Sequence, residues 1–133
     1  MDRRPIGVFD SGIGGLTVVK EIMEVLPDED IIYFGDTARV PYGSKSKETV
    51  IKFSFQCIRF LLEKGVKAIV IACNTASSAA LDVAQQSFDI PIVGVVEPGA
   101  VTACRVTRTN KIGIIGTEGT VSSGAYEKAI YRI

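Results

Sequence analysis

The apolar run at residues 67–72 ends in three polar residues, Cys73, Asn74 and Thr75, and then passes into small residues. This pattern predicts a buried strand whose polar tip opens a helix. A thiol at a helix N-terminus has its thiolate stabilised by backbone N–H groups and by the helix dipole. Cys73 is therefore a candidate for proton transfer at carbon. The alternative is a small core cysteine, with Thr75 or Ser77 as the helix N-cap.

A second polar cluster is the glycine-rich turn DSGIGG at residues 10–15. The turn resembles a dinucleotide fingerprint, and Asp36 stands where a ribose-binding acid is expected. However, Thr17 replaces the third glycine, and Asp10 places an anion where pyrophosphate would bind. A carboxylate better suits an ammonium ion or a proton transfer, and the Ser11 hydroxyl can donate to a substrate carboxylate. The alternative for Asp10 is a turn residue that bonds to nearby N–H groups.

The third candidate region is the loop at residues 36–46, which is long for a strand-to-helix connection. Pro41, Tyr42 and Gly43 predict a stiff turn with an aromatic hydroxyl, and the N–H groups of Tyr42 and Gly43 could bind an anion. The alternative is a turn that only closes the loop.

Alternating strand and helix patterns must position these residues. We expect strands at 5–10, 30–36, 67–72, 90–96 and 111–116, and helices at 16–27, 46–65, 75–88, 98–108 and from near Val121. Strands rich in β-branched residues that alternate with helices predict an α/β fold, with a parallel sheet covered by helices on both faces. Ligands of such sheets bind beyond the carboxyl ends of the strands. The residues at those ends are Asp10, Ser11, Asp36, Cys73, Asn74, Thr75, Glu97 and Thr117.

Composition excludes several classes of function. The chain has 133 residues, no net charge and no basic cluster, which disfavours nucleic-acid binding. There is no histidine, so a Cys–His pair and the usual zinc sets are absent, and we expect no metal. No segment resembles a membrane span or a signal peptide, and three cysteines do not suggest a disulfide framework. We therefore expect a cytoplasmic protein with free thiols, in which Cys57 and Cys104 are structural.

Two segments, at 6–15 and 112–121, resemble each other weakly. Each has an apolar run, a hydroxyl-bearing tip and a glycine-rich turn. They could begin two related domains, or they could only show that such turns look alike.

Taken together, the motifs IGVFDSGIGGLTVVKEI, DTARVPYGSKS, IACNTASSAAL, IPIVGVVEPGA and IGIIGTEGTVSSGAY resemble glutamate racemases over essentially the whole chain. The resemblance implies a cofactor-independent enzyme that interconverts L- and D-glutamate for peptidoglycan synthesis, with two similar α/β domains around its site. It implies that Cys73 is one catalytic thiol, facing the α-proton of D-glutamate, with Asp10 assisting. The substrate-binding residues it implies are Asp10, Ser11, Pro41, Tyr42, Gly43, Asn74, Thr75, Thr117 and Thr120.

One departure from the family is large. Its second active-site cysteine lies in a Gly-Cys-Thr-His motif, which this chain lacks. Because racemisation needs a base and an acid on opposite faces of the α-carbon, we expect the 133 residues alone to be inactive. We expect residues 1–97 to be an incomplete first domain and 98–133 the start of a second. A racemase for aspartate, a nucleotide- or phosphate-binding module and an inactive regulatory fragment remain alternatives, and the oligomeric state, with a homodimer as one possibility, stays open.

Overall fold

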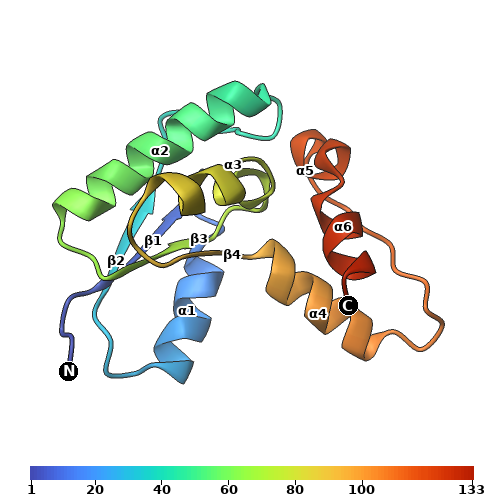
Figure 1. Cartoon of the computed structure of the whole chain (residues 1–133), viewed down its shortest axis with the longest axis horizontal. Helices are drawn as coiled ribbons and strands as arrows, with labels where there is room; N and C mark the ends of the chain where they lie inside the picture. Colours follow the sequence, from blue (N-terminus) through green and yellow to red (C-terminus); the bar gives the residue numbers. More distant parts are fainter.

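A computed structural model describes all residues, 1–133, and contains one parallel β-sheet with helices packed around it (Figure 1). The strands are β1 (Ile6–Asp10), β2 (Ile31–Gly35), β3 (Ala68–Ile71) and β4 (Ile92–Gly94). The helices are α1 (Leu16–Val25), α2 (Lys47–Glu63), α3 (Asn74–Ser87), α4 (Val96–Val106), α5 (Glu118–Ser123) and α6 (Ala125–Tyr131). The predicted α/β class is thereby confirmed.

The sheet has the strand order β2-β1-β3-β4, and all three pairings are parallel. β1 lies in the middle, with its last residue, Asp10, opposite Gly35 of β2. On its other side, Phe9 lies opposite Ile71, the last residue of β3. The carboxyl ends of these three strands therefore meet at one edge of the sheet, as the sequence pattern required.

Helices cover both faces of the sheet, as predicted. In Figure 1, α2 and α3 lie on one side of the strands and α1 lies on the other. The larger core lies under α2 and α3 and includes the fully buried side chains of Phe9, Ile58, Leu61 and Ile69. Burial of each such side chain stabilises the fold by about 1.5–3 kcal/mol. The smaller core, around Val8, packs against α1.

Helix α2 follows the sequence prediction closely. Ser46 is its N-cap, and the Ser46 side chain accepts the Thr49 N–H at 3.2 Å. The helix ends before Gly65, whose φ of +74° suits a residue without a side chain. Its buried stripe contains Val50, Ser54, Cys57, Ile58 and Leu61, so the placement of Cys57 in the core is confirmed.

The C-terminal third of the chain forms a separate arm of helices (Figure 1). Val96 and Ala100 of α4 pack against Ala129 of α6 in an apolar cluster of their own. The helix predicted from near Val121 begins at Glu118 and is interrupted by Gly124, whose φ is +65°. This residue divides the helical segment into α5 and α6.

Two predictions at the sequence level are wrong. Residues 111–116 form no strand, although their pattern is apolar, and the Ile115 side chain is 99% exposed. A strand needs a neighbouring backbone to bond with, and no other strand lies beside this segment. β4 is also much shorter than the predicted 90–96, because Pro91 has no N–H to donate and α4 already begins at Val96.

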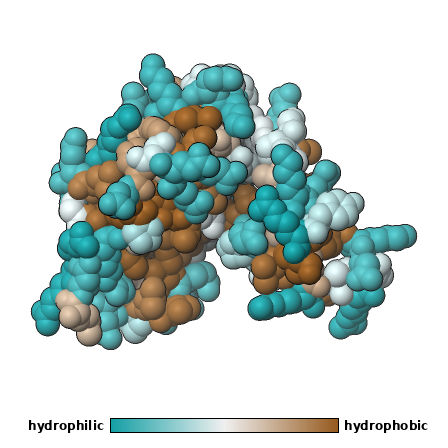
Figure 2. All heavy atoms as spheres, in the orientation of Figure 1, coloured by the Kyte–Doolittle hydropathy of each residue, from teal (hydrophilic) through white to brown (hydrophobic).

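The surface exposes several large apolar side chains. Figure 2 shows apolar surface on both sides of the hollow between the sheet and the helical arm. The most exposed of these side chains in the arm include those of Val106, Ile115 and Tyr131. No helix combines the length and the apolar character needed to cross a membrane.

Candidate active site

Cys73 lies where β3 meets α3 and is 6% exposed. It is itself the N-cap of α3, since its Sγ accepts the Ala76 N–H at 3.4 Å. Thr75 and Ser77, the alternative caps, lie inside the helix. The Cys73 thiol also donates to the Ser11 hydroxyl at 3.6 Å, because β3 and β1 are adjacent strands. The predicted thiol and the predicted hydroxyl therefore lie together at the sheet edge.

Asp10 ends β1 and is also 6% exposed. Its Oδ2 accepts the Gly15 N–H at 2.9 Å, at the start of α1. Gly15 is required at this point, because a Cβ there would lie 2.7 Å from the Asp10 Cβ. The glycine-rich turn thus wraps around a carboxyl group. A pyrophosphate would have to compete with that carboxyl group for the same helix N-terminus. This arrangement disfavours dinucleotide binding at the glycine-rich turn.

Tyr33 contacts the turn that follows Asp10. Its hydroxyl donates to the Gly12 carbonyl at 2.8 Å. Burial raises the pKa of Tyr33, and the charges of Asp10 and Cys73 raise that pKa further. Tyr33 therefore stays protonated beside the site and holds the turn that follows Asp10.

The loop at 36–46 differs from its sequence prediction in one respect. The Tyr42 hydroxyl is not presented at the surface: Tyr42 is 1% exposed, and its hydroxyl donates to Asp36 Oδ2. Burial, followed by this hydrogen bond, raises the pKa of Tyr42 well above its usual range. Only the main chain of Tyr42 and of the buried Gly43 is left to meet a ligand, while Pro41 is exposed at the turn.

The predicted threonines come together from two distant segments. Thr75 Oγ1 lies 2.7 Å from Thr117 Oγ1 and 3.3 Å from Thr120 Oγ1. The turn that carries Thr117 and Thr120 is held by a hydrogen bond from the Gly119 N–H to the Gly43 carbonyl, at 3.0 Å. The arm is therefore docked on the first turn of α3, close to the thiol.

Asn74 forms a hydrogen bond with Tyr126, a residue that the sequence analysis did not select. Its Oδ1 accepts a hydrogen bond from the Tyr126 hydroxyl of α6. The sequence pattern places Asp36 at a strand tip, in the position of a ribose-binding acid, and gives no sign of its hydrogen bond with Tyr42. No sequence signal could have found either contact, because both depend on how distant segments pack.

Several backbone donors at this edge have no partner within the chain. The N–H groups concerned donate to neither a backbone nor a side-chain acceptor, and they belong to Ser11, Tyr42, Gly43, Asn74 and Thr75. Unpaired N–H groups at a helix N-terminus and in a turn bind carboxylates and other anions well. Combined with a thiol and a carboxyl group, they suit a small amino acid with more than one carboxylate.

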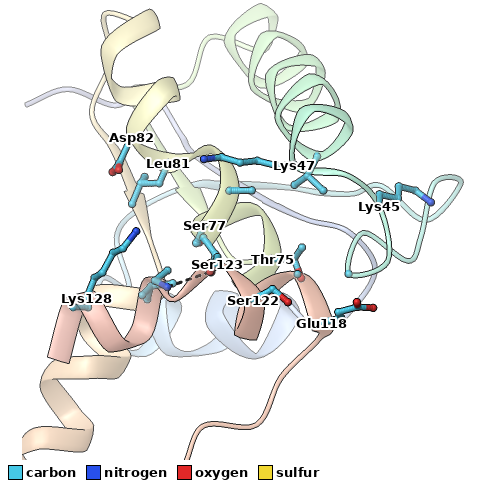
Figure 3. Close-up of a pocket in the computed structure, with 18 of the residues that line it drawn as sticks. Lys45, Lys47, Thr75, Ser77, Leu81, Asp82, Glu118, Ser122, Ser123 and Lys128 are labelled. Atoms are coloured by element: carbon cyan, nitrogen blue, oxygen red, sulfur yellow. Dashed lines mark hydrogen bonds between the residues drawn. The ribbon is translucent and has the colours of Figure 1, made fainter. Parts of the chain in front are cut away.

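A cavity lies adjacent to this cluster and does not contain the thiol. It has a volume of about 610 Å³ and lies between α2, α3 and the helical arm. Figure 3 shows Lys45, Lys47 and Lys128 around it, together with Asp82 and Glu118. The cavity shares Gly43 and Thr75 with the site described above. We place the chemistry at Cys73 because the thiol, the carboxyl group and the free N–H donors meet there. No group of three or more Cys, Asp or Glu side chains is close enough to hold a metal ion.

Comparison with known proteins identifies the family. A sequence profile of the Asp/Glu/Hydantoin racemase family matches residues 6–133. The chain belongs to this family. The family resemblance expected from the motifs is thereby confirmed.

The similar proteins are glutamate racemases. The chain is 59% identical over 133 residues to the enzyme of Geobacter metallireducens, covering 100% of this chain and 49% of that one. It is 60% identical over 131 residues to the enzyme of Neisseria meningitidis serogroup C, covering 98% and 48%. The chain thus spans about half the length of the curated relatives it matches.

Solved structures of members of this racemase family share the fold. A glutamate racemase isoform from Bacillus anthracis has a TM-score of 0.95 and 49% identity, covering 99% of this chain and 50% of that one. The Francisella tularensis glutamate racemase, in complex with D-glutamate, has a TM-score of 0.89 and 51% identity, covering 99% and 49%. The polar edge of the sheet described above therefore belongs to an amino-acid racemase fold.

Proposed function

We propose that a protein containing this chain interconverts L- and D-glutamate by proton transfer at the α-carbon, with Cys73 as one of two catalytic thiols. The observation that carries the proposal is the position of the Cys73 thiol. It lies at the N-terminus of α3, 3.6 Å from the Ser11 hydroxyl and among free N–H donors. The relatives named as glutamate racemases support the choice of substrate.

Racemisation requires a base and an acid on opposite faces of the α-carbon. The Cys73 thiolate removes the α-proton of D-glutamate and becomes a thiol. The bonding electron pair stays on the α-carbon as a carbanion. A second thiol then donates a proton to the opposite face and becomes a thiolate, which gives L-glutamate. The reverse reaction exchanges the two roles.

Asp10 assists from beside the thiol. Its carboxyl group is held by the Gly15 N–H, in reach of the substrate's ammonium group or of a proton on its way to Cys73. The charges of both groups raise the pKa of Tyr33.

Substrate binding uses the backbone donors and the hydroxyl groups. The N–H groups of Tyr42 and Gly43 bind one carboxylate from the loop. Asn74 and Thr75 bind from the start of α3, and the Ser11 hydroxyl donates to a carboxylate. Pro41 sets the course of the loop, and Thr117 and Thr120 close the site from the arm.

The second thiol belongs to a part of the protein outside these 133 residues. Cys57 is 1% exposed and faces Asp36 and Tyr42 in the core, so it cannot reach a substrate. Cys104 lies near the far end of α4, which runs away from the sheet (Figure 1). The relatives are about twice as long as this chain, which leaves room for the missing thiol.

The division into domains follows the same reasoning. Residues 1–97 contribute the sheet body, and residues 98–133 begin a second α/β domain. The separate apolar cluster of α4 and α6 supports a second unit that begins at about the start of α4, since the cluster also includes Val96. The exposed apolar segment at 111–116 would pair as a strand with the rest of that domain.

The resemblance to glutamate racemases implies the biological context. Two thiols suffice for the proton transfers, so the reaction uses no cofactor. The product, D-glutamate, supplies peptidoglycan synthesis in the cytoplasm. A homodimer is the assembly we propose for the complete protein.

A direct assay separates this proposal from its alternatives. A protein carrying this segment at the length of its relatives is incubated with D-glutamate, L-glutamate, D-aspartate or NAD. We expect chiral chromatography to show racemisation of both glutamate enantiomers, and calorimetry to show no NAD binding. Turnover of aspartate in preference to glutamate would favour the aspartate alternative, and NAD binding without turnover would favour the nucleotide-binding one.

A further inference from the structure

Asp36 is a buried carboxylate with no role in the proton transfers described above. It follows β2 directly and is 5% exposed. A buried carboxylate is costly to keep unless it is paired and hydrogen-bonded. Here Oδ2 accepts from Arg39 Nε at 2.8 Å and from the Tyr42 hydroxyl. Its side chain is therefore committed to the loop that follows it.

The backbone of Asp36 connects the same residue to the catalytic strand. Its N–H donates to the Asp10 carbonyl at 2.9 Å. Asp36 thus bonds to Asp10 through its main chain and to Tyr42 through its side chain. No other residue of the loop joins the end of β1 to the Pro41–Gly43 turn in this way.

The side chain of Tyr42 is held by Phe53, Asp36 and Cys57. It packs against Phe53, with ring centroids 5.7 Å apart, and its hydroxyl lies 3.7 Å from Cys57 Sγ. Arg39 stacks over the same Phe53 ring, 4.0 Å from its centroid. Because burial and the bond to Asp36 raise the pKa of Tyr42, the hydroxyl stays protonated and remains a donor to the carboxylate.

Fixing Tyr42 also fixes the main chain beside it. The Tyr42 carbonyl accepts the Lys45 N–H at 3.0 Å, and the Gly43 carbonyl accepts the Gly119 N–H at 3.0 Å. The N–H groups of Tyr42 and Gly43 have no partner in the chain. A turn anchored from below by its side chain, with free donors in its main chain, is preorganised for an anion.

We propose that Asp36 is a positioning residue for substrate binding, which acts by holding the Tyr42 hydroxyl so that the free N–H groups of Tyr42 and Gly43 are preset for a substrate carboxylate. This inference rests on the proposed racemase function for its ligand. The anchoring of the turn itself can be measured without any catalysis.

The first measurement is amide hydrogen exchange by NMR on this chain. In Asp36→Ala, we expect the N–H groups of Lys45 and Gly119 to exchange about 10-fold faster or more, because the carbonyls that accept them are no longer held. Asp36→Asn keeps an oxygen that can accept from the Tyr42 hydroxyl and should restore most of the protection. The control is Ile58→Val, which removes one methyl group from the same core and changes no residue of the loop. It should leave these two amides unchanged.

The second measurement is racemase kinetics in a protein carrying this segment at the length of its relatives. Donors that bind the carboxylate equally in the ground state and the transition state affect KM and leave kcat alone. We expect Asp36→Ala to raise KM for both glutamate enantiomers about 10-fold or more, with kcat changed by less than about 3-fold. Asp36→Asn should fall between Asp36→Ala and the wild type, and Ile58→Val should match the wild type.

The outcomes separate the two proposals. Unchanged exchange in Asp36→Ala, or equal effects in Ile58→Val, would overturn the anchoring. Faster exchange with an unchanged KM, or a loss confined to kcat, would overturn the positioning of substrate. A wild-type protein without racemase activity would contradict the proposed function, and the exchange result would still decide whether Asp36 holds the turn.

Discussion

Gly43 packs against Thr117 so closely that a Cβ on Gly43 would lie 2.4 Å from the Thr117 Cβ. Real Cβ atoms do not approach each other to this distance, so only glycine fits. The contact joins the loop after β2 to the turn before α5, which are far apart in the sequence. It brings the two halves of the candidate substrate site together and depends on the absence of one side chain.

Gly43→Ala should therefore separate the loop from the arm. Overpacking at a close contact typically costs about 1–3 kcal/mol of unfolding free energy, and we expect a loss in this range. Chemical denaturation measures it. Gly113→Ala is the matched control, because a Cβ at Gly113 would meet no atom within 4 Å. Equal stability of the two variants would contradict the docking of Thr117 on Gly43.

The three thiols should differ in reactivity. Burial raises the pKa of the Cys57 thiol to about 11, so almost no thiolate exists there at neutral pH. Cys73 Sγ faces the backbone N–H groups at the N-terminus of α3, whereas Cys104 lies near the C-terminal end of α4, so Cys73 is the better placed nucleophile. We expect brief iodoacetamide treatment near neutral pH to label Cys73 first and Cys57 last, as shown by peptide mapping.

The pH dependence of this labelling has a definite sign. The Cys57 thiolate becomes more abundant as the pH rises toward about 11, so labelling of Cys57 in the folded chain should increase steadily over that range. Early labelling of Cys57 at neutral pH in a folded sample would show that its environment is not the one described.

Much of the fold could be predicted from residue patterns alone. The apolar stripe of α2, with Cys57 in it, follows from helical periodicity, and the meeting of Asp10 and Cys73 follows from parallel strands. The strand predicted at residues 111–116 is absent. An apolar pattern indicates that a segment could pair as a strand, but it does not supply the partner strand. The Tyr42 hydroxyl points into the core because it donates a hydrogen bond to Asp36, and no local sequence pattern encodes this contact.

Asp10→Asn should slow racemisation without disturbing the fold. The amide oxygen of asparagine can still accept the Gly15 N–H, but the charge beside the thiol is lost. In a protein at the length of its relatives, we expect kcat to fall by about 10-fold or more. Chiral chromatography gives the rate, and circular dichroism controls for folding. An unchanged kcat would show that Asp10 takes no part in the proton transfer.

The 133 residues alone should not racemise glutamate. Only one of the two opposite-face thiols lies at the site, since Cys57 is buried beneath the loop and Cys104 lies on α4. A chiral assay of the purified chain is the test. Turnover near the rate of a protein of full family length would refute the need for a second thiol from outside this chain.

Solvent deuterium incorporation at the α-carbon shows whether Cys73 is the base that removes the α-proton of D-glutamate. The measurement compares Cys73→Ser with the wild type, in a protein at the length of its relatives, starting from each enantiomer. Serine keeps the size of the side chain, but its hydroxyl is too weak an acid to supply a useful base, so exchange from D-glutamate should fall by about 10³-fold or more. Wild-type exchange from D-glutamate in Cys73→Ser would show that another group removes this proton.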